Sequence, residues 1–230
     1  MREDFHGEMD RLVDRLLSMG DTVVTMLDRA VDSLVNEDAE LANEVIRADD
    51  GIDSDYADVQ SRVVRVMALQ APVASDLRLL SAMLHVNIHL ERMGDYALNV
   101  AKMGKWSAPY KEDVELAGQL REMASIAMEV GRSAIASFGR LDVEAAQRLP
   151  GLDDGVDDLN IGLFRRLVER AARDERYLEW ATRMILVSRQ IERYGDHGVD
   201  IGEATIFAVT GDMIELSSNA PDRTGGPYRR

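Results

Sequence analysis

The sequence predicts an all-α fold made of two tandem, antiparallel three-helix bundles that are related by an internal repeat. The helix formers Ala, Leu, Met, Glu and Arg dominate the chain, and aromatic residues make up only 5% of it. Apolar residues recur at intervals of three and four positions over six long segments. The second half of the chain repeats motifs of the first half, which indicates that one three-helix plan is used twice.

The first half, residues 1–108, contains three of these helical segments. We expect helices over about residues 7–35, 37–69 and 76–105. The turns between them are short, so neighbouring helices should run antiparallel. The apolar side of the first segment carries Leu12, Leu16, Met19, Val23, Met26 and Leu27. The helical pattern breaks around Pro109, where we place the boundary between the halves.

The second half, residues 109–212, contains the other three segments. We expect helices over about residues 112–139, 143–173 and 177–210. Pro150 and Gly151 lie in the early turns of the middle segment and should disturb it. The last residues, 213–230, are rich in Ser, Asn, Pro and Gly, and they predict a disordered tail.

Two short motifs carry the internal repeat. Residues 49–53 recur as residues 153–157, at an offset of 104 positions. Residues 90–95 recur as residues 191–196, at an offset of 101 positions. The difference of three positions fits a shorter turn before the last helix. A repeat of about this length predicts two three-helix units.

The charge balance and the absence of cysteine exclude several classes of function. The 27 basic and 42 acidic residues give a net charge of −15, which argues against nucleic acid as a partner because phosphate binding draws on clustered Lys and Arg. The lack of cysteine excludes disulfides, thiol catalysis and cysteine-ligated zinc. The sequence shows neither an apolar leader nor a long uncharged apolar stretch, so we expect neither a signal peptide nor direct membrane insertion.

Each half carries two pairs of carboxylates spaced by four residues. The pairs are Asp49/Asp53, Glu91/Asp95, Asp153/Asp157 and Glu192/Asp196, and one turn after the last pair stands Asp200. Glu91 and Asp95 share a helical row with apolar residues, namely Leu77, Leu80, Leu84, Ile88 and Leu98. A buried carboxylate must be protonated, paired with a cation or bound to a metal. Antiparallel packing would bring four carboxylates together in each half, a ligand set that suits Mg, Mn, Fe or Zn ions.

Two simpler explanations of these carboxylates stay open. The acids can lie on solvated helix faces, where such pairs are common. Alternatively, arginine side chains from another element can neutralise them. Arg92 and Arg193 each follow the Glu of a pair, but they point about 100° away from the carboxylate row.

The histidines are weaker candidates for ligands. His85 and His89 have the spacing of two helical metal ligands, but the first half alone carries such a pair, and packing explains it more simply. His197 adjoins Asp196, either as an additional ligand or as a mere neighbour. A Glu-x-x-His motif occurs at residues 3–6 only, which argues against a ferritin-like oxidase. Neither a phosphate-binding loop nor a Ser/His/Asp pattern is present, so we expect no enzyme.

At these motifs the sequence resembles the PhoU family of accessory and regulatory proteins of bacterial phosphate-specific transport. The family carries a repeated (Glu/Asp)-x-x-x-Asp motif, which all four pairs fit. The segment Glu-Arg-x-Gly-Asp occurs at residues 91–95 and again at 192–196. Residues 76–78 and 206–211 also look like the family, and the similarity covers about residues 5–211.

The resemblance implies a fold, a metal content and partners. PhoU-like proteins are pairs of three-helix bundles that form homodimers and hold metal clusters, often multinuclear, of Fe, Zn, Mn or Mg. They act at the cytoplasmic face of the Pst phosphate transporter and link its ATPase, PstB, to the sensor histidine kinase PhoR. They repress the phosphate-starvation response when phosphate is plentiful. The carboxylates that match the motifs, together with Asp200, would be the metal ligands.

Two departures from the repeat predict unequal sites in the two halves. Pro150 lies one turn before Asp153, and the first half has no proline at the equivalent place. Asn99 stands in the first half where Asp200 stands in the second, so the two sites differ in charge.

Two other functions remain as alternatives. One is a carboxylate-bridged di-metal hydrolase or oxidase, which would need an enclosed pocket and an open coordination position. The other is a metal-free helical scaffold whose acidic residues face a basic partner.

Overall fold

The structure, a computed structural model, describes residues 2–106 and 114–217, and all regular structure in them is helical. The helices are α1 (Arg2–Asn36), α2 (Ala39–Gln70), α3 (Ala74–Trp106), α4 (Val114–Arg140), α5 (Val143–Gln147), α6 (Leu149–Arg173), the 3₁₀ turn η1 (Glu175–Tyr177) and α7 (Leu178–Thr210). Within the described residues, none of these helices combines the length and the apolar character needed to cross a membrane.

The predicted all-α architecture of two three-helix bundles is confirmed. α1, α2 and α3 pack together in the first bundle, and α4, α6 and α7 pack together in the second. The predicted disturbance of the fifth helix is a break at Arg148, after which α6 begins with Pro150 in its first turn. Proline is tolerated there because the first N–H groups of a helix have no helical partner. The predicted boundary at Pro109 lies outside the described residues.

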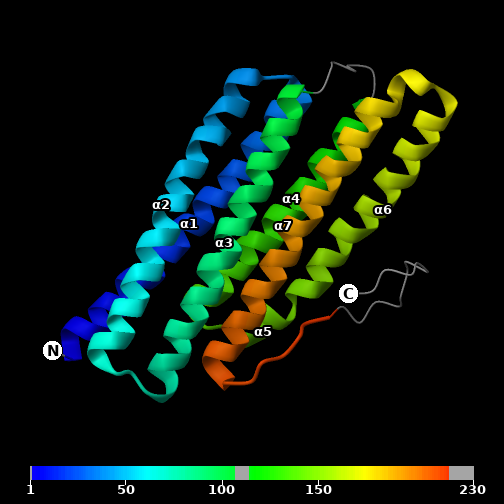
Figure 1. The fold of residues 1–230 in the computed structure, drawn as a ribbon. Helices are drawn as coiled ribbons and strands as arrows, with labels where there is room; N and C mark the ends of the chain where they lie inside the picture. The colour runs from blue at the N-terminus through cyan, green and yellow to red at the C-terminus, as the bar shows by residue number, and fades with distance from the viewer. Residues whose placement is uncertain (1, 107–113, 218–230) are drawn as a thin grey trace.

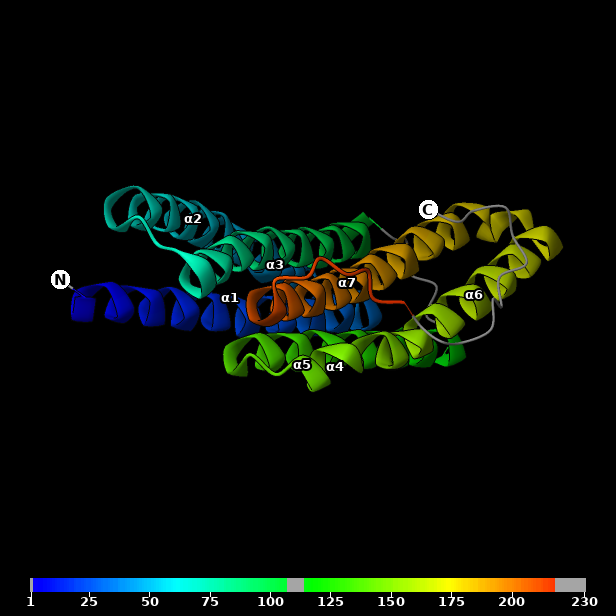
Figure 2. The same cartoon turned by 90° about the horizontal axis from the view of Figure 1, so that it is seen from below.

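The two bundles lie side by side. In Figure 1, α2, α3, α7 and α6 follow one another from left to right, and α1 and α4 lie behind them. Figure 2 shows α4 on the side of α7 away from α3. The contacts between bundles join equivalent helices, α3 with α7 and α1 with α4. α3 and α7 run antiparallel (Figure 1), as expected when two repeats are related by a half turn.

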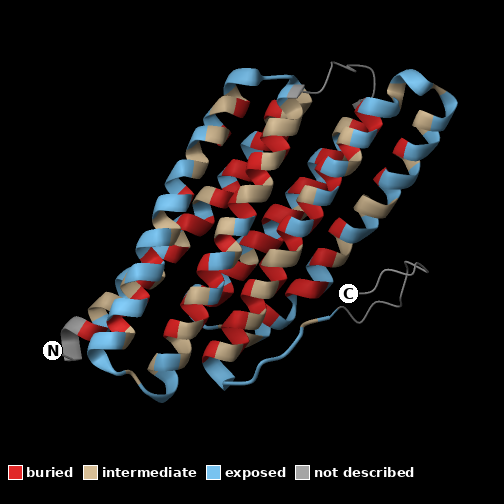
Figure 3. Cartoon of the chain, in the orientation of Figure 1, coloured by how far each residue is buried: buried red, intermediate tan, exposed pale blue. Residues whose placement is uncertain are grey.

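One continuous apolar core joins the bundles. The predicted apolar side of α1 is buried throughout, and Leu12, Met19 and Leu27 are completely inaccessible to solvent. Figure 3 shows buried residues on the inward faces of the helices and exposed residues along the outer faces of α2 and α6. α2 and α6 therefore form the two flanks of the molecule, and α3 and α7 form its centre.

The row of α3 that carries Glu91 and Asp95 is only partly buried. Leu80 and Leu98 of this row are buried, as its apolar pattern predicts, but Leu77 and Ile88 are 45% and 42% exposed. The buried face of α3 instead carries Met83, Val86, Leu90, Met93, Ala97, Val100 and Ala101. This face is buried because α3 packs against α1, α2 and α7 at once.

The described residues after α7 form an extended segment. Gly211 ends α7 with a positive φ of 85°, and its N–H donates to the carbonyl of Phe207. The N–H of Leu216 donates to the Glu203 carboxylate at 2.7 Å, and the Leu216 side chain packs against the core. The first five residues of the predicted disordered tail, 213–217, thus lie against the second bundle. The rest of it, 218–230, lies outside the described residues.

Candidate metal centres

The structure places four of the predicted carboxylates between α2 and α3. We call Asp49, Asp53, Glu91 and Asp95 the first cluster. Asp49 lies against α3, because its Oδ1 is 3.6 Å from the position that a Cβ would take at Gly94. The two motifs of the first half therefore meet across the contact of α2 with α3, as the sequence predicts.

The first cluster is partly open to solvent and partly neutralised. Burial, together with the negative charges of Asp53 and Asp95, raises the pKa of Asp49 to about 6. Burial and the Asp95 charge likewise raise the pKa of Glu91. The Arg92 guanidinium offsets part of this repulsion, since it lies 3.2 Å from Asp95 Oδ2 and 3.5 Å from Glu91 Oε2.

Four equivalent carboxylates lie between α6 and α7. We call Asp153, Asp157, Glu192 and Asp196 the second cluster. Asp153 and Glu192 are each only 7% exposed, so this cluster is buried more deeply than the first. A Cβ at Gly195 would stand 2.2 Å from Asp153 Oδ1. Glycine at this position therefore lets the Asp153 carboxylate lie against the α7 backbone.

Burial and mutual repulsion strongly oppose ionisation in the second cluster. Burial, together with the negative charges of Asp157, Asp196 and Glu192, raises the pKa of Asp153 to about 8. Burial and the Asp196 charge also raise the pKa of Asp157, while Arg189 opposes this rise. At neutral pH the second cluster therefore holds a proton or requires a cation.

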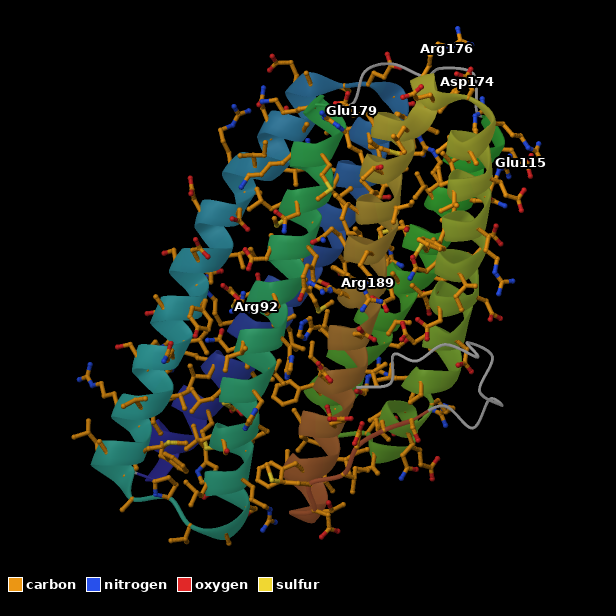
Figure 4. All side chains as sticks on the ribbon, turned by 45° about the vertical axis from the view of Figure 1, so that its right-hand side comes forward. Arg92, Glu115, Asp174, Arg176, Glu179 and Arg189 are labelled. Carbon is orange, nitrogen blue, oxygen red and sulfur yellow. The ribbon has the colours of Figure 1, made fainter. Side chains whose placement is uncertain are left out.

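The arginines that reach the clusters come from the same helices as the carboxylates. Arg92 on α3 contacts the first cluster, so our prediction that it points away was wrong. Arg189 on α7 forms an ion pair with Glu192, one turn further along the helix. Figure 4 shows Arg92 and Arg189 at the middle height of the bundle, each on its own helix. Residues three positions apart are neighbours on a helix surface, so each arginine reaches the acidic residue one turn further along.

One buried oxygen atom in particular indicates that the second cluster can hold a metal ion. Within the described part of the chain, the Oδ1 atom of Asp153 is buried and has no hydrogen-bond partner. A buried acceptor without a partner destabilises the folded protein, because it loses its hydration and gains no hydrogen bond. A proton or a cation can supply the missing interaction. Asp153, Asp157 and Asp196 also line an open hollow of about 510 Å³, which has room for an ion and its waters.

Asp200 occupies a different position from the other predicted ligands. It lines the same hollow as Asp153, but its Oδ2 also lies 3.0 Å from His197 Nδ1 and 3.5 Å from His89 Nδ1. Burial lowers the pKa of His89 to about 4, so this imidazole is neutral at pH 7. The sequence analysis missed the pairing of His89 with His197, because it joins residues 108 positions apart. The available signal was that α3 and α7 carry the same motif at an offset of 101.

Comparisons with known proteins agree with this architecture. The family model of the PhoU domain matches residues 16–103 and 120–205, one match in each repeat. A curated relative from Mycobacterium tuberculosis, "Phosphate-specific transport system accessory protein PhoU homolog 2", is 36% identical over 153 residues, which are 64% of this chain and 68% of the relative. A PhoU homolog from Xylella fastidiosa is 28% identical over 212 residues, 92% of this chain and 89% of the relative.

Two solved structures share the fold. The crystal structure of PhoU from Pseudomonas aeruginosa superposes with a TM-score of 0.83 at 30% identity, over 90% of this chain and all of that one. The crystal structure of the phosphate transport system regulatory protein PhoU from Streptococcus pneumoniae superposes with a TM-score of 0.85, over 92% of this chain and all of that one. Its sequence identity is 23%, so this likeness concerns the fold alone.

Proposed function

The chain belongs to the PhoU family, and we propose that it is a metal-binding regulator of phosphate uptake and phosphate signalling. In this proposal it acts as an adaptor rather than as an enzyme. It forms a homodimer at the cytoplasmic face of the membrane and links the transporter ATPase PstB to the sensor kinase PhoR. When phosphate is plentiful, the adaptor keeps the kinase from activating the phosphate-starvation genes.

The observation that carries the metal-binding part of the proposal is the buried Asp153 carboxylate. Its Oδ1 has no hydrogen-bond partner among the described residues, and three further carboxylates surround it. An ion such as Mn²⁺, Fe²⁺, Mg²⁺ or Zn²⁺ would supply the missing positive charge and relieve the mutual repulsion. In the first cluster the ligands would be Asp49, Asp53, Glu91 and Asp95. In the second they would be Asp153, Asp157, Glu192 and Asp196, with Asp200 beside them.

Elemental analysis tests this assignment. The untagged protein, purified without chelator, is compared by inductively coupled plasma mass spectrometry with the double variants Glu91→Ala/Asp95→Ala and Glu192→Ala/Asp196→Ala. We expect stoichiometric metal in the wild type and a loss from the altered cluster in each variant. The matched control is Asp10→Ala/Asp14→Ala, an exposed pair on α1 with the same spacing. Metal that is retained in full by both cluster variants would contradict the assignment.

A binding measurement tests the adaptor role separately. The protein is immobilised, and the binding of purified PstB and of the PhoR cytoplasmic region is measured with and without chelator. We expect both partners to bind the metal-loaded form. Binding that is unchanged in chelator would favour the metal-free scaffold, in which the acidic clusters dock a basic partner. Hydrolase or oxidase turnover by the metal-loaded protein would instead favour the di-metal enzyme.

A further inference from the structure

The contact between α3 and α7, which we call the seam, has a pseudo-symmetric centre. Tyr96 of α3 and His197 of α7 stack there, with ring centroids 5.4 Å apart and ring planes inclined by 16°. They are equivalent residues of the two repeats, because they are separated by the 101 positions that relate the two motifs. The Tyr96 hydroxyl also lies 3.2 Å from His197 Nε2. This pair divides the seam into two equivalent ends.

The two ends of the seam carry different chemistry at equivalent positions. At one end, the Asn99 side-chain amide donates to Gln190 Oε1 at 3.2 Å. At the other end, the equivalents of these two residues are Asp200 and His89, with 3.5 Å between Oδ2 and Nδ1. The molecule therefore contains one amide pair and, at the matching place, one carboxylate–imidazole pair.

The second of these ends presents three ligand atoms in a compact triangle. His89 Nδ1 and His197 Nδ1 are 2.8 Å apart, and Asp200 Oδ2 lies 3.0 Å from His197 Nδ1 and 3.5 Å from His89 Nδ1. With metal–ligand distances of about 2.0–2.2 Å, neighbouring ligands stand about 3.3 Å apart in tetrahedral and about 3.0 Å apart in octahedral coordination. The triangle thus matches one face of a coordination shell after side-chain shifts of a few tenths of an ångström.

We propose that His89, His197 and Asp200 form a binding site for a borderline divalent transition-metal ion of the Zn²⁺ class. Two imidazole nitrogens and one carboxylate oxygen suit such ions, whereas the clusters of carboxylates suit harder ones. Tyr96 supports the site from behind. When His197 Nε2–H donates to the Tyr96 hydroxyl oxygen, the lone pair of Nδ1 faces Asp200 and His89, which is the usual arrangement around a metal-bound histidine.

Access to the site is open on one side. The side chains of His89, His197 and Asp200 are 19%, 20% and 31% exposed, so they are neither sealed in nor fully solvated. His89 and Asp200 line a hollow together with His85 and Glu203. An ion can enter from this hollow, and water or one of these two side chains can complete its coordination.

The proposed ion would join the two bundles. His89 comes from α3 of the first repeat, and His197 and Asp200 come from α7 of the second. The first and second clusters, by contrast, each lie within one bundle. Binding at the seam therefore stabilises the arrangement of the repeats relative to each other, which goes beyond the proposed adaptor function and does not depend on it.

Zinc titration followed by imidazole NMR tests the site directly. The chain contains four histidines, so the ¹H–¹⁵N correlations of their rings can be assigned by single substitutions. The full-length protein is freed of metal with chelator and titrated with Zn²⁺. We expect the Nδ1 resonances of His89 and His197 to shift together, while exposed His6 on α1 stays unchanged. Ions on the clusters of carboxylates do not produce this pattern. Failure of the two resonances to shift in excess Zn²⁺ would overturn the proposal.

A variant that copies the other end of the seam supplies the matched control. His89→Gln/Asp200→Asn recreates the Asn99–Gln190 amide pair, so we expect it to fold normally. In the NMR titration it should bind Zn²⁺ at His197 at least tenfold more weakly, and its zinc-induced rise in Tm should be smaller by the part that the triad contributes. His6→Gln should keep both responses of the wild type. Equal zinc affinity at His197 in the double variant and the wild type would show that the triad is not the site.

Discussion

The first and second clusters share a motif but differ in the depth at which they bury it. In the first cluster the Asp95 side chain is 36% exposed, and its partner Arg92 is 53% exposed. In the second cluster the Glu192 side chain is only 9% exposed beneath Arg189. The pKa values follow this order, about 6 for Asp49 against about 8 for its equivalent Asp153.

The two equivalent glycines show where the difference arises. The nearest atom to a Cβ at Gly94 would be Ile52 Cγ2, at 3.3 Å. The nearest atom to a Cβ at Gly195 would be Asp153 Oδ1, at 2.2 Å. A carboxylate and an apolar side chain face the glycine in both bundles, but the Asp153 carboxylate lies much closer to Gly195 than the Asp49 carboxylate, at 3.6 Å, lies to Gly94. The comparison teaches that one motif can form an exposed acidic edge or a buried charged centre, depending on how the two helices meet.

The largest expected effect is a pH dependence that Asp153 imposes on the metal-free protein. Its pKa is about 8 in the folded protein against an ordinary value of 3.8, so the folded state binds a proton between these pH values. The free energy of unfolding should therefore fall as the pH rises through this window, by about 1.4 kcal/mol per pH unit at most. Between pH 5 and pH 7, Asp153→Asn should remove about 2–3 kcal/mol of this loss, as measured by urea unfolding in chelator.

Asp49→Asn is the control that tests the comparison itself. The pKa of Asp49 in the folded protein is about 6, so the pH range over which it lowers the free energy of unfolding ends at a lower pH than that of Asp153. Its effect on stability should therefore be smaller. Wild type, Asp49→Asn and Asp153→Asn should have similar dependence on pH below about pH 3, where both carboxyls are protonated in folded and unfolded chains. An equal effect of the two substitutions would show that the clusters are not buried to different depths.

The next largest effect concerns the glycines. The added methyl group of Gly195→Ala would displace the Asp153 carboxylate, so metal affinity of the second cluster should fall about tenfold or more. Gly94→Ala meets only ordinary or slightly tight contacts with Ile52 and Asp49, so the first cluster should keep its affinity within a few-fold. Isothermal titration with Mn²⁺ compares the two variants. Similar losses in both would argue against the special fit of Asp153 beneath Gly195.

The smallest effect concerns the arginines. Arg189→Gln removes the ion-pair partner of buried Glu192 and should destabilise the metal-free protein by about 1 kcal/mol. Arg92→Gln removes more exposed contacts and should have an effect below about 0.5 kcal/mol. Both variants should bind divalent cations more tightly, because a competing positive charge is lost. Thermal unfolding with and without Mn²⁺ measures both quantities, and a larger effect at Arg92 would reverse the proposed order of burial.

The fold and the members of the clusters were largely predictable. Helix periodicity predicts the six long helices, and Pro150 predicts the break before α6. The four-residue spacing of Glu91 and Asp95 places both on one side of α3, whatever that side packs against. The periodicity could not predict how far this side of α3 is buried. Ile88, in the same row, is 42% exposed.

The sequence by itself determined the helical fold, the internal repeat, the membership of the PhoU family and the carboxylates that form each cluster. These properties follow from residue spacing within single helices and from motifs read along the chain. Only the tertiary structure decided that Asp153 and Glu192 are buried, and that His89 meets His197 and Asp200 at the seam. The physical reason is that burial and contact depend on the register between helices, which is set by packing across some hundred residues of chain.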